Sequence, residues 1–190
     1  MRSYSCRARR SSRLLAATVI LAGMSARPAY AQSVSEFELK AAFVYNFAKF
    51  TEWPAETLRP GGPLVFCVNG DDGIETALAQ TTKNRLLEGH QVVVRRLGDG
   101  EPTHTCHILY VSASTGHDRT VQLVETLTTA SVLTISDRSG FATRSGIAEL
   151  FIENGRVRFA INVNAALRSR LHISSRLLSL AKIIKYEDGK

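Results

Sequence analysis

The sequence predicts a single α/β domain, with a mainly parallel or mixed sheet flanked by helices and a C-terminal β-hairpin, after an N-terminal signal peptide. Short apolar runs alternate along the chain with amphipathic stretches of helical period. The pair Asn154-Gly155 separates two strand-like runs, which is a strong hairpin signal. Because no repeat, linker or low-complexity stretch interrupts residues 32–190, we expect them to form one domain.

Residues 1–31 have the three parts of a secretory signal peptide. An arginine-rich segment precedes the uncharged apolar stretch Leu14–Met24, and Ala29-Tyr30-Ala31 places small residues before a cleavage site between Ala31 and Gln32. The apolar stretch is shorter than the roughly 20 residues that a transmembrane helix needs. We therefore expect export to the periplasm, with Arg9-Arg10 leaving both the Sec and the twin-arginine routes open.

The net charge of +7 originates in this leader. Residues 1–31 contain six arginines and no acidic residue, so the remaining chain is close to neutral. A nucleic-acid-binding protein carries its positive charge on the folded part. The charge distribution therefore predicts no nucleic-acid partner.

The first half of the mature chain predicts a helix followed by strands and helices in alternation. Ser35 can cap the first helix, which should end near Trp53-Pro54 because a residue before proline avoids the helical region. Its apolar face is formed by Phe37, Leu39, Ala42, Phe43, Val44, Phe47 and Phe50. Strands are expected over residues 64–68, 92–97, 106–111 and 131–136, and helices over residues 74–80 and 118–128.

The C-terminal part predicts a hairpin and two helices. The hairpin strands cover residues 147–152 and 157–163, and Asn164 begins a helical stretch that ends at Arg168. Ser174 is expected to cap a last helix whose apolar face contains Leu177, Leu178, Leu180, Ala181 and Ile184. That face either completes the core or partly serves a partner surface.

The mature chain retains two cysteines, Cys67 and Cys106. An even pair in an oxidising compartment favours a disulfide, and the alternative is two buried thiols on neighbouring strands. A bridge would close a loop of about 40 residues and contribute roughly 4 kcal/mol on the chain-entropy model.

Motifs that carry chemistry are weak in this chain. Gly70-Asp71-Asp72-Gly73 lacks both the third glycine of a dinucleotide fingerprint and the lysine of a P-loop, so a capped turn is favoured. His104, Cys106 and His107 are possible metal ligands, but no second cluster supplies the remaining ligands. We therefore predict no cofactor and no metal.

Catalytic patterns are equally weak. Ser139-Gly140 and Ser145-Gly146 lie in a predicted loop without the spacing of a nucleophile elbow. Asn162 and Asn164 are explained by capping of the following helix or by pairing with nearby backbone. We predict that the protein is not an enzyme, which favours a binding or regulatory role.

Several segments together resemble the YfiR family of periplasmic proteins, and the resemblance covers nearly all of residues 32–190. These segments are 40–50 (KAAFVYNFAKF), 52–54 (EWP), 66–70 (FCVNG), 94–97 (VRRL), 158–163 (RFAINV) and 171–181 (LHISSRLLSLA).

The resemblance implies a non-enzymatic periplasmic inhibitor of an inner-membrane diguanylate cyclase, YfiN in that family. An OmpA-like outer-membrane lipoprotein sequesters the inhibitor, after which cyclic di-GMP rises and favours biofilm over motility. The family is often dimeric, and Cys67 and Cys106 match one of its disulfide pairs. A second pair known in the family has no counterpart here, and partner-binding residues are not predicted.

An alternative function is that of a periplasmic small-molecule-binding or sensing module. Open α/β sheets bind ligands at the carboxyl ends of their strands. The turns after Val68 and Val111 would form that site.

Overall fold

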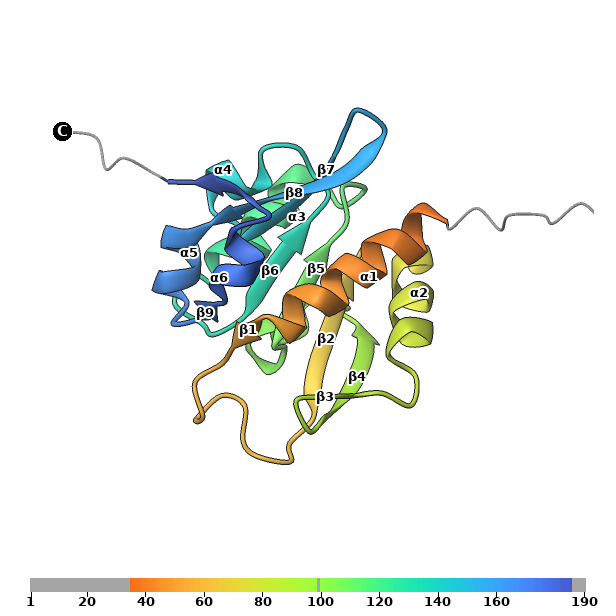
Figure 1. Cartoon of the computed structure of the whole chain (residues 1–190), viewed down its shortest axis with the longest axis vertical. Helices are drawn as coiled ribbons and strands as arrows, with labels where there is room; N and C mark the ends of the chain where they lie inside the picture. Colours follow the sequence, from red (N-terminus) through yellow and green to blue (C-terminus); the bar gives the residue numbers. More distant parts are fainter. Residues whose placement is uncertain (1–34, 99, 186–190) are drawn as a thin grey trace, which may run out of the picture. The chain divides into compact units, whose positions relative to one another are not determined.

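A mixed eight-stranded sheet organises the structure (Figure 1), which is a computed structural model describing residues 35–98 and 100–185. The strand order is β10-β8-β7-β6-β5-β2-β4-β3. The strands are β2 (Leu64–Asn69), β3 (Leu86–Leu87), β4 (His90–Arg96), β5 (Ile108–Val111), β6 (Leu133–Ser136), β7 (Ala148–Glu153), β8 (Arg156–Asn162) and β10 (Lys182–Ile184). The neighbours from β4 to β7 pair in parallel, whereas β8 is antiparallel to β7 and β3 is antiparallel to β4. The predicted α/β class with a mixed sheet is confirmed.

Helices cover both faces of this sheet. They are α1 (Glu36–Lys49), α2 (Asp72–Thr82), the 3-10 turn η1 (Thr103–Thr105), α3 (His117–Glu125), α4 (Phe141–Arg144), α5 (Val163–Arg168) and α6 (Ser175–Leu178). Helices α1 and α2 pack side by side on one face, with buried residues of α5 and α6 in the same core (Figure 1). Helix α3 belongs to a smaller core on the other face.

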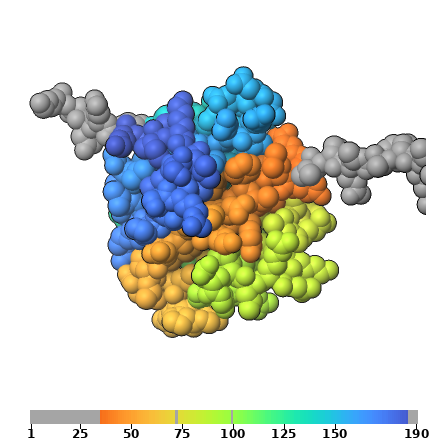
Figure 2. Space-filling view, in the orientation of Figure 1, coloured from red at the N-terminus to blue at the C-terminus, as the bar shows by residue number. Residues whose placement is uncertain are grey.

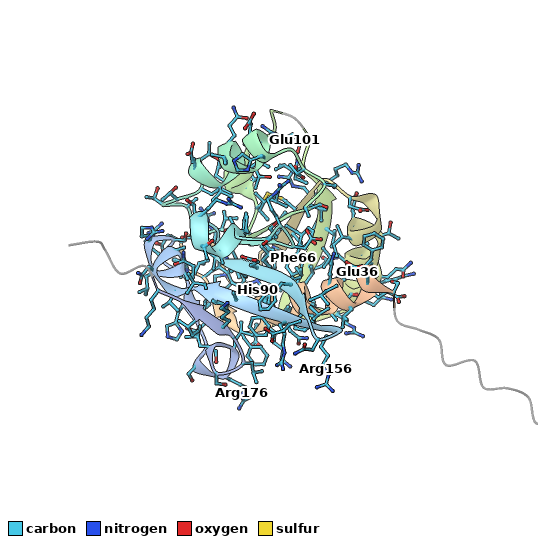
Figure 3. The ribbon with its side chains drawn as sticks, turned by 90° about the horizontal axis from the view of Figure 1, so that it is seen from above. Glu36, Phe66, His90, Glu101, Arg156 and Arg176 are labelled. Carbon is cyan, nitrogen blue, oxygen red and sulfur yellow. A yellow bond between two sulfur atoms is a disulfide. The ribbon has the colours of Figure 1, made fainter. Side chains whose placement is uncertain are left out.

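Aromatic packing holds α1 against the sheet. Phe47 of α1, Phe66 of β2 and Tyr110 of β5 are fully buried, and Figure 3 shows Phe66 inside the molecule. The rings of Phe47 and Phe159 meet edge-on with centroids 5.0 Å apart. Full burial of one large apolar side chain contributes about 1.5–3 kcal/mol, so these contacts fix the position of α1.

Helix α1 begins as predicted and ends earlier than predicted. Ser35 and Glu38 form a capping box. The Ser35 hydroxyl accepts a 3.1 Å hydrogen bond from the Glu38 backbone N–H, and the Glu38 carboxylate accepts one of 2.8 Å from the Ser35 backbone N–H. The helix stops at Phe50 rather than near Trp53-Pro54, because Thr51–Glu52 forms strand β1, which pairs with β9 (His172–Ile173). Pairing with a distant strand thus ends the helix before the proline does.

The hairpin prediction is confirmed. Strands β7 and β8 pair from Ala148↔Ile161 to Glu153↔Arg156. Asn154 and Gly155 both have positive φ, at 52° and 70°, as a type I′ turn requires.

The predicted last helix is wrong beyond its first turn. Helix α6 ends at Leu178, and the chain then forms β10, in which Lys182 pairs with Ala160 and Ile184 with Asn162 in a parallel register. A short apolar run does not distinguish a helix from a strand. The outer edge of β8 decides that residues 182–184 form a strand rather than a helix. This edge would have no neighbour without them, and it offers backbone hydrogen bonds to a segment with β-branched residues.

The predicted signal peptide and its cleavage site between Ala31 and Gln32 lie outside the described residues. They remain predictions.

Candidate functional site

The Cys67–Cys106 disulfide is present. Cys67 lies in the middle of β2 and Cys106 lies two residues before the start of β5, with their Cα atoms 5.8 Å apart. Both residues are buried among Leu97, Leu109 and Leu123 in the core beneath α3. The bridge therefore joins two central strands from the interior of the domain.

A charged side chain lies next to this bridge. The Arg95 guanidinium is 3.7 Å from the Cys106 sulfur, and it donates hydrogen bonds to Glu101 at 2.7 Å and to Thr105 at 2.5 Å. Glu101 belongs to the loop that follows β4 (Figure 3). The loop and the disulfide are thus connected through one arginine.

Two of the three possible metal ligands, Cys106 and His107, have structural roles, and His104 is exposed. Cys106 is bonded to Cys67, and His107 Nδ1 accepts a hydrogen bond of 3.0 Å from the Val65 backbone N–H. His107 Nε2 lies 3.3 Å from the Thr57 carbonyl and donates to it in this tautomer. Burial lowers the pKa of His107, which keeps the ring neutral. Among the described residues, no group of three or more metal-ligating side chains comes together.

The small-molecule alternative predicts a ligand site at the carboxyl ends of the central strands. The strand order changes direction between β2 and β5, and such a switch point is the usual ligand site of open α/β sheets. The Thr115 hydroxyl donates to the Asn69 side chain at 3.1 Å, and the Ser112 N–H donates to the Asn69 carbonyl at 2.9 Å. A Cβ at Gly70, whose φ is 111°, would lie 2.6 Å from the Ser112 Cβ. The two turns therefore pack directly on each other.

Helix α1 fills the remaining space at this edge. Lys40 Nζ lies 2.6 Å from Asp137 Oδ2 and 2.5 Å from Glu36 Oε1, and only 12% of the Lys40 side chain is exposed. The other Asp137 oxygen accepts a 2.6 Å hydrogen bond from the Ala113 N–H. The Phe37 ring would be 2.6 Å from a Cβ placed on Gly73, at the start of α2. Figure 2 shows α1 seated between α2 and the C-terminal part of the chain.

A buried tyrosine completes this arrangement. Burial, followed by the charge of Asp137 and a hydrogen bond to it, raises the pKa of Tyr110 far above its ordinary value. The switch point consequently contains a satisfied polar network of the protein itself, closed by Lys40. This arrangement does not favour the small-molecule alternative.

Two further sequence candidates, Asp71 and Asn162, also have structural roles. The Asp71 carboxylate caps α2 by accepting from the Gly73 N–H at 2.8 Å, as the capped-turn interpretation predicts. The Asn162 side chain caps α5 through the Ala165 N–H at 2.9 Å.

Ser139-Gly140 and Ser145-Gly146 flank the short helix α4. The carboxylate of Glu149, which is 9% exposed, accepts from the N–H groups of Gly140 and Ala142 at 3.0 and 3.1 Å. This buried acid therefore positions the start of α4.

Sequence reasoning missed Lys40, Asp137 and Glu149. One signal for Lys40 was present, because it lies within the apolar face of the first helix, three residues after Phe37 and four before Val44. A lysine in such a position needs a partner, but the sequence does not identify Asp137 as that partner.

A small apolar hollow lies on the other face, between α3 and α4. It measures about 50 Å³ and is lined by Val121, Val124 and Phe141, with Arg138 and Arg144 at its border. Ligand sites usually measure about 300–1,000 Å³, so this hollow has room for little more than one side-chain tip.

Comparison with known proteins identifies a family. The model of the YfiR/HmsC-like family matches residues 37–182, more than three quarters of the chain. No curated protein sequence matches the chain significantly. Within the described part, every helix is too short or too polar to cross a lipid bilayer.

Proposed function

Because this chain belongs to the YfiR/HmsC-like family of periplasmic regulators of cyclic di-GMP signalling, we propose that it represses an inner-membrane diguanylate cyclase. It does so by binding the periplasmic region of the cyclase. The match over residues 37–182 is the observation that carries this proposal, since the family is regulatory and non-catalytic. An OmpA-like outer-membrane lipoprotein sequesters the regulator and releases the cyclase, and the regulator forms a homodimer.

The proposed mechanism is a shift in a conformational equilibrium. A regulator changes the activity of a sensor only to the extent that it binds the inactive conformation more tightly than the active one. A rigid domain suits this role, because a preorganised binding surface loses little conformational entropy when it binds. The internal Cys67–Cys106 bridge and the Lys40–Asp137 ion pair support such rigidity.

Export is part of the proposal. The arginine-rich leader, with cleavage between Ala31 and Gln32, would deliver the domain to the periplasm. The disulfide agrees with this compartment, because disulfides persist there and are rare in the cytosol.

The proposal is tested by deleting the gene in its host and measuring intracellular cyclic di-GMP. We expect cyclic di-GMP to rise and to return to its original level when the full-length gene is restored on a plasmid. A gene that lacks codons 2–31 is the matched control, since its product stays in the cytoplasm and should not restore repression. An unchanged cyclic di-GMP level in the deletion strain would contradict the proposal.

A direct measurement complements the genetic one. The purified mature domain is titrated against the purified periplasmic region of each diguanylate cyclase that the host encodes. Saturable binding to one of these regions is expected, together with loss of repression when that cyclase is also deleted.

A further inference from the structure

The outer edge of β4 is open along most of its length, and a groove lies between this edge and α2. We propose that they bind an extended, acidic segment of a partner protein, which adds to the sheet as a further strand. This inference rests on the proposed regulatory function and identifies the surface that carries it.

Strand β4 lacks a neighbour along most of its outer side. Strand β3 pairs with it only at Leu86↔Gln91 and Leu87↔His90. On its inner side, β4 pairs with β2 from Val92 to Arg96. In the part of the chain that the structure describes, no strand lies beside β4 beyond Gln91 on the outer side.

The backbone of this edge is oriented for strand addition. The Leu97 N–H donates to the Val68 carbonyl at 2.8 Å, so Leu97 directs its backbone groups toward β2. Successive residues of a strand point their N–H and C=O groups to opposite sides. Val92 and Val94 therefore direct theirs outward, where each offers one donor and one acceptor to an added strand.

A groove runs along this edge beside α2, which lies next to β4 in Figure 1. It consists of two hollows of about 430 and 500 Å³, which meet at Ala79 and Lys83 of the α2 region. Val92 and Val94 line the first hollow and are themselves partly buried. An extended peptide placed here would bond to β4 through its backbone and direct alternate side chains into the groove.

The charges around the groove determine the partner's chemistry. Among the described side chains, Lys83, Arg85 and Arg96 line it together with a single acid, Glu75. Arg96 contacts Glu75 at 2.9 Å, and the Arg85 guanidinium lies over the Tyr45 ring at 5.8 Å. The excess of positive charge favours an acidic segment.

Self-association through the same edge is disfavoured by these charges. Two β4 edges paired with each other would bring both copies of Lys83, Arg85 and Arg96 together. Like charges placed opposite one another destabilise a strand pair. A different, acidic partner is therefore the occupant that fits.

Two pairs of variants test the proposal. V94P removes an outward-directed N–H at an edge position, where proline is compatible with a strand, and V94I is its control because it keeps the N–H. K83E reverses a charge beside the groove. K182E is its control, because Lys182 is exposed on β10 at the opposite edge of the sheet.

Two probes are used with the mature domain. The first is the purified periplasmic region of each host diguanylate cyclase, and the second is an acetylated peptide of alternating glutamate and valine. Affinity is measured by titration, and the contact region by hydrogen exchange. Unfolding midpoints verify that each variant is folded. If V94P does not fold, the affinity of K83E and the hydrogen exchange of the natural sequence decide the outcome.

We expect the amides of residues 92–96 to become protected on binding. V94P should weaken binding at least about tenfold, because it removes a backbone hydrogen bond and obstructs the added strand. K83E should weaken it roughly threefold, and less in high salt. V94I and K182E should bind like the natural sequence.

The outcomes separate this inference from the proposed function. If a cyclase region binds V94P and K83E with full affinity, or protects a different region, the edge proposal is overturned while the proposed function stands. If no cyclase region binds but the acidic peptide protects residues 92–96 and loses affinity to K83E, the edge is supported and the cyclase is not its partner. Absence of binding by both probes overturns the edge proposal.

Discussion

Lys40 of α1 and Asp137 of the loop after β6 form an ion pair with a 2.6 Å distance between Nζ and Oδ2, although 97 residues separate them in the sequence. Both side chains are largely buried, with 12% and 14% exposed. The pair covers the switch point at the carboxyl ends of the strands. The Lys40 side chain therefore occupies the place where many α/β proteins bind a ligand. This relationship explains why α1 is part of the domain's core.

Removal of the Lys40 charge should destabilise the domain. K40M leaves the Asp137 carboxylate without its cationic partner, and we expect a loss of about 2 kcal/mol in the free energy of unfolding. Urea denaturation measures this loss. K49M is the matched control, because Lys49 is exposed at the end of the same helix and should cost less than about 0.5 kcal/mol.

The same ion pair predicts an alkaline loss of stability. Burial by itself would lower the pKa of Lys40, but the hydrogen bonds and charges of Asp137 and Glu36 raise it above the ordinary 10.5. A raised pKa in the folded state contributes stability that is present below pH 10.5 and is lost as the pH rises through the higher value. The free energies of unfolding of the natural protein and K40M should therefore converge above that pH. If the difference between these two free energies of unfolding stayed constant with pH, Lys40 would stabilise the domain by packing alone.

His107 should make stability sensitive to acid. Burial lowers its pKa below the ordinary 6.5, so the unfolded chain binds a proton more readily than the folded one. Its contribution is present above pH 6.5 and is lost as the pH falls toward the lower value. H107Q should be less stable by roughly 1 kcal/mol at neutral pH and should show a flatter pH profile between pH 7 and about 5.

An exposed histidine provides the comparison for that experiment. H104Q replaces an exposed histidine two residues before Cys106. We expect its profile of unfolding free energy against pH to match that of the natural protein. An equal flattening in both variants would mean that His107 is not the responsible group.

Reduction of the disulfide should strongly destabilise the domain. Replacing Cys67 and Cys106 together by alanine removes a bridge across 39 positions, and we expect a loss of about 4 kcal/mol. Urea denaturation of the natural protein with and without dithiothreitol should reproduce this difference. In cells, the proposed repression of a cyclase should fall together with the amount of folded protein. Full repression by the double variant would exclude a role for the bridge.

Gly70 should not tolerate a side chain. Its φ of 111° is unfavourable for other residues, and an added Cβ would overlap the Ser112 Cβ at 2.6 Å. We expect G70A to lose at least about 2 kcal/mol of stability in urea denaturation. G116A is the control, because nothing lies within 4 Å of a Cβ at Gly116 and its φ is negative. That variant should change stability by about 1 kcal/mol or less.

Local signals in the sequence were sufficient for several elements. Asn154-Gly155 predicted the hairpin because its turn type depends on two adjacent residues alone. Ser35 predicted the start of α1, because an N-cap depends on one residue and the backbone next to it. The continuous apolar runs predicted the central strands because a strand covered on both faces has no polar side.

Elements that depend on distant partners were missed or wrong. Strand β1 exists because Thr51 meets Ile173, and no two-residue strand is visible in a sequence by itself. Residues 182–184 look like part of a helix until β8 provides an edge for them. In both cases the decisive interaction is a backbone hydrogen bond, which leaves no trace in the pattern of side chains.

The sequence by itself determined the α/β class, the hairpin, the cysteine pair and the family resemblance, because each depends on local periodicity or on the identities of ordered residues. Only the tertiary structure decided that Lys40 reaches Asp137 and that Phe37 packs on Gly73. It alone also decided that the outer edge of β4 stays open beside α2. The physical reason is that filled crevices and open sheet edges depend on which distant segments meet, and that is set by the packing of the whole domain.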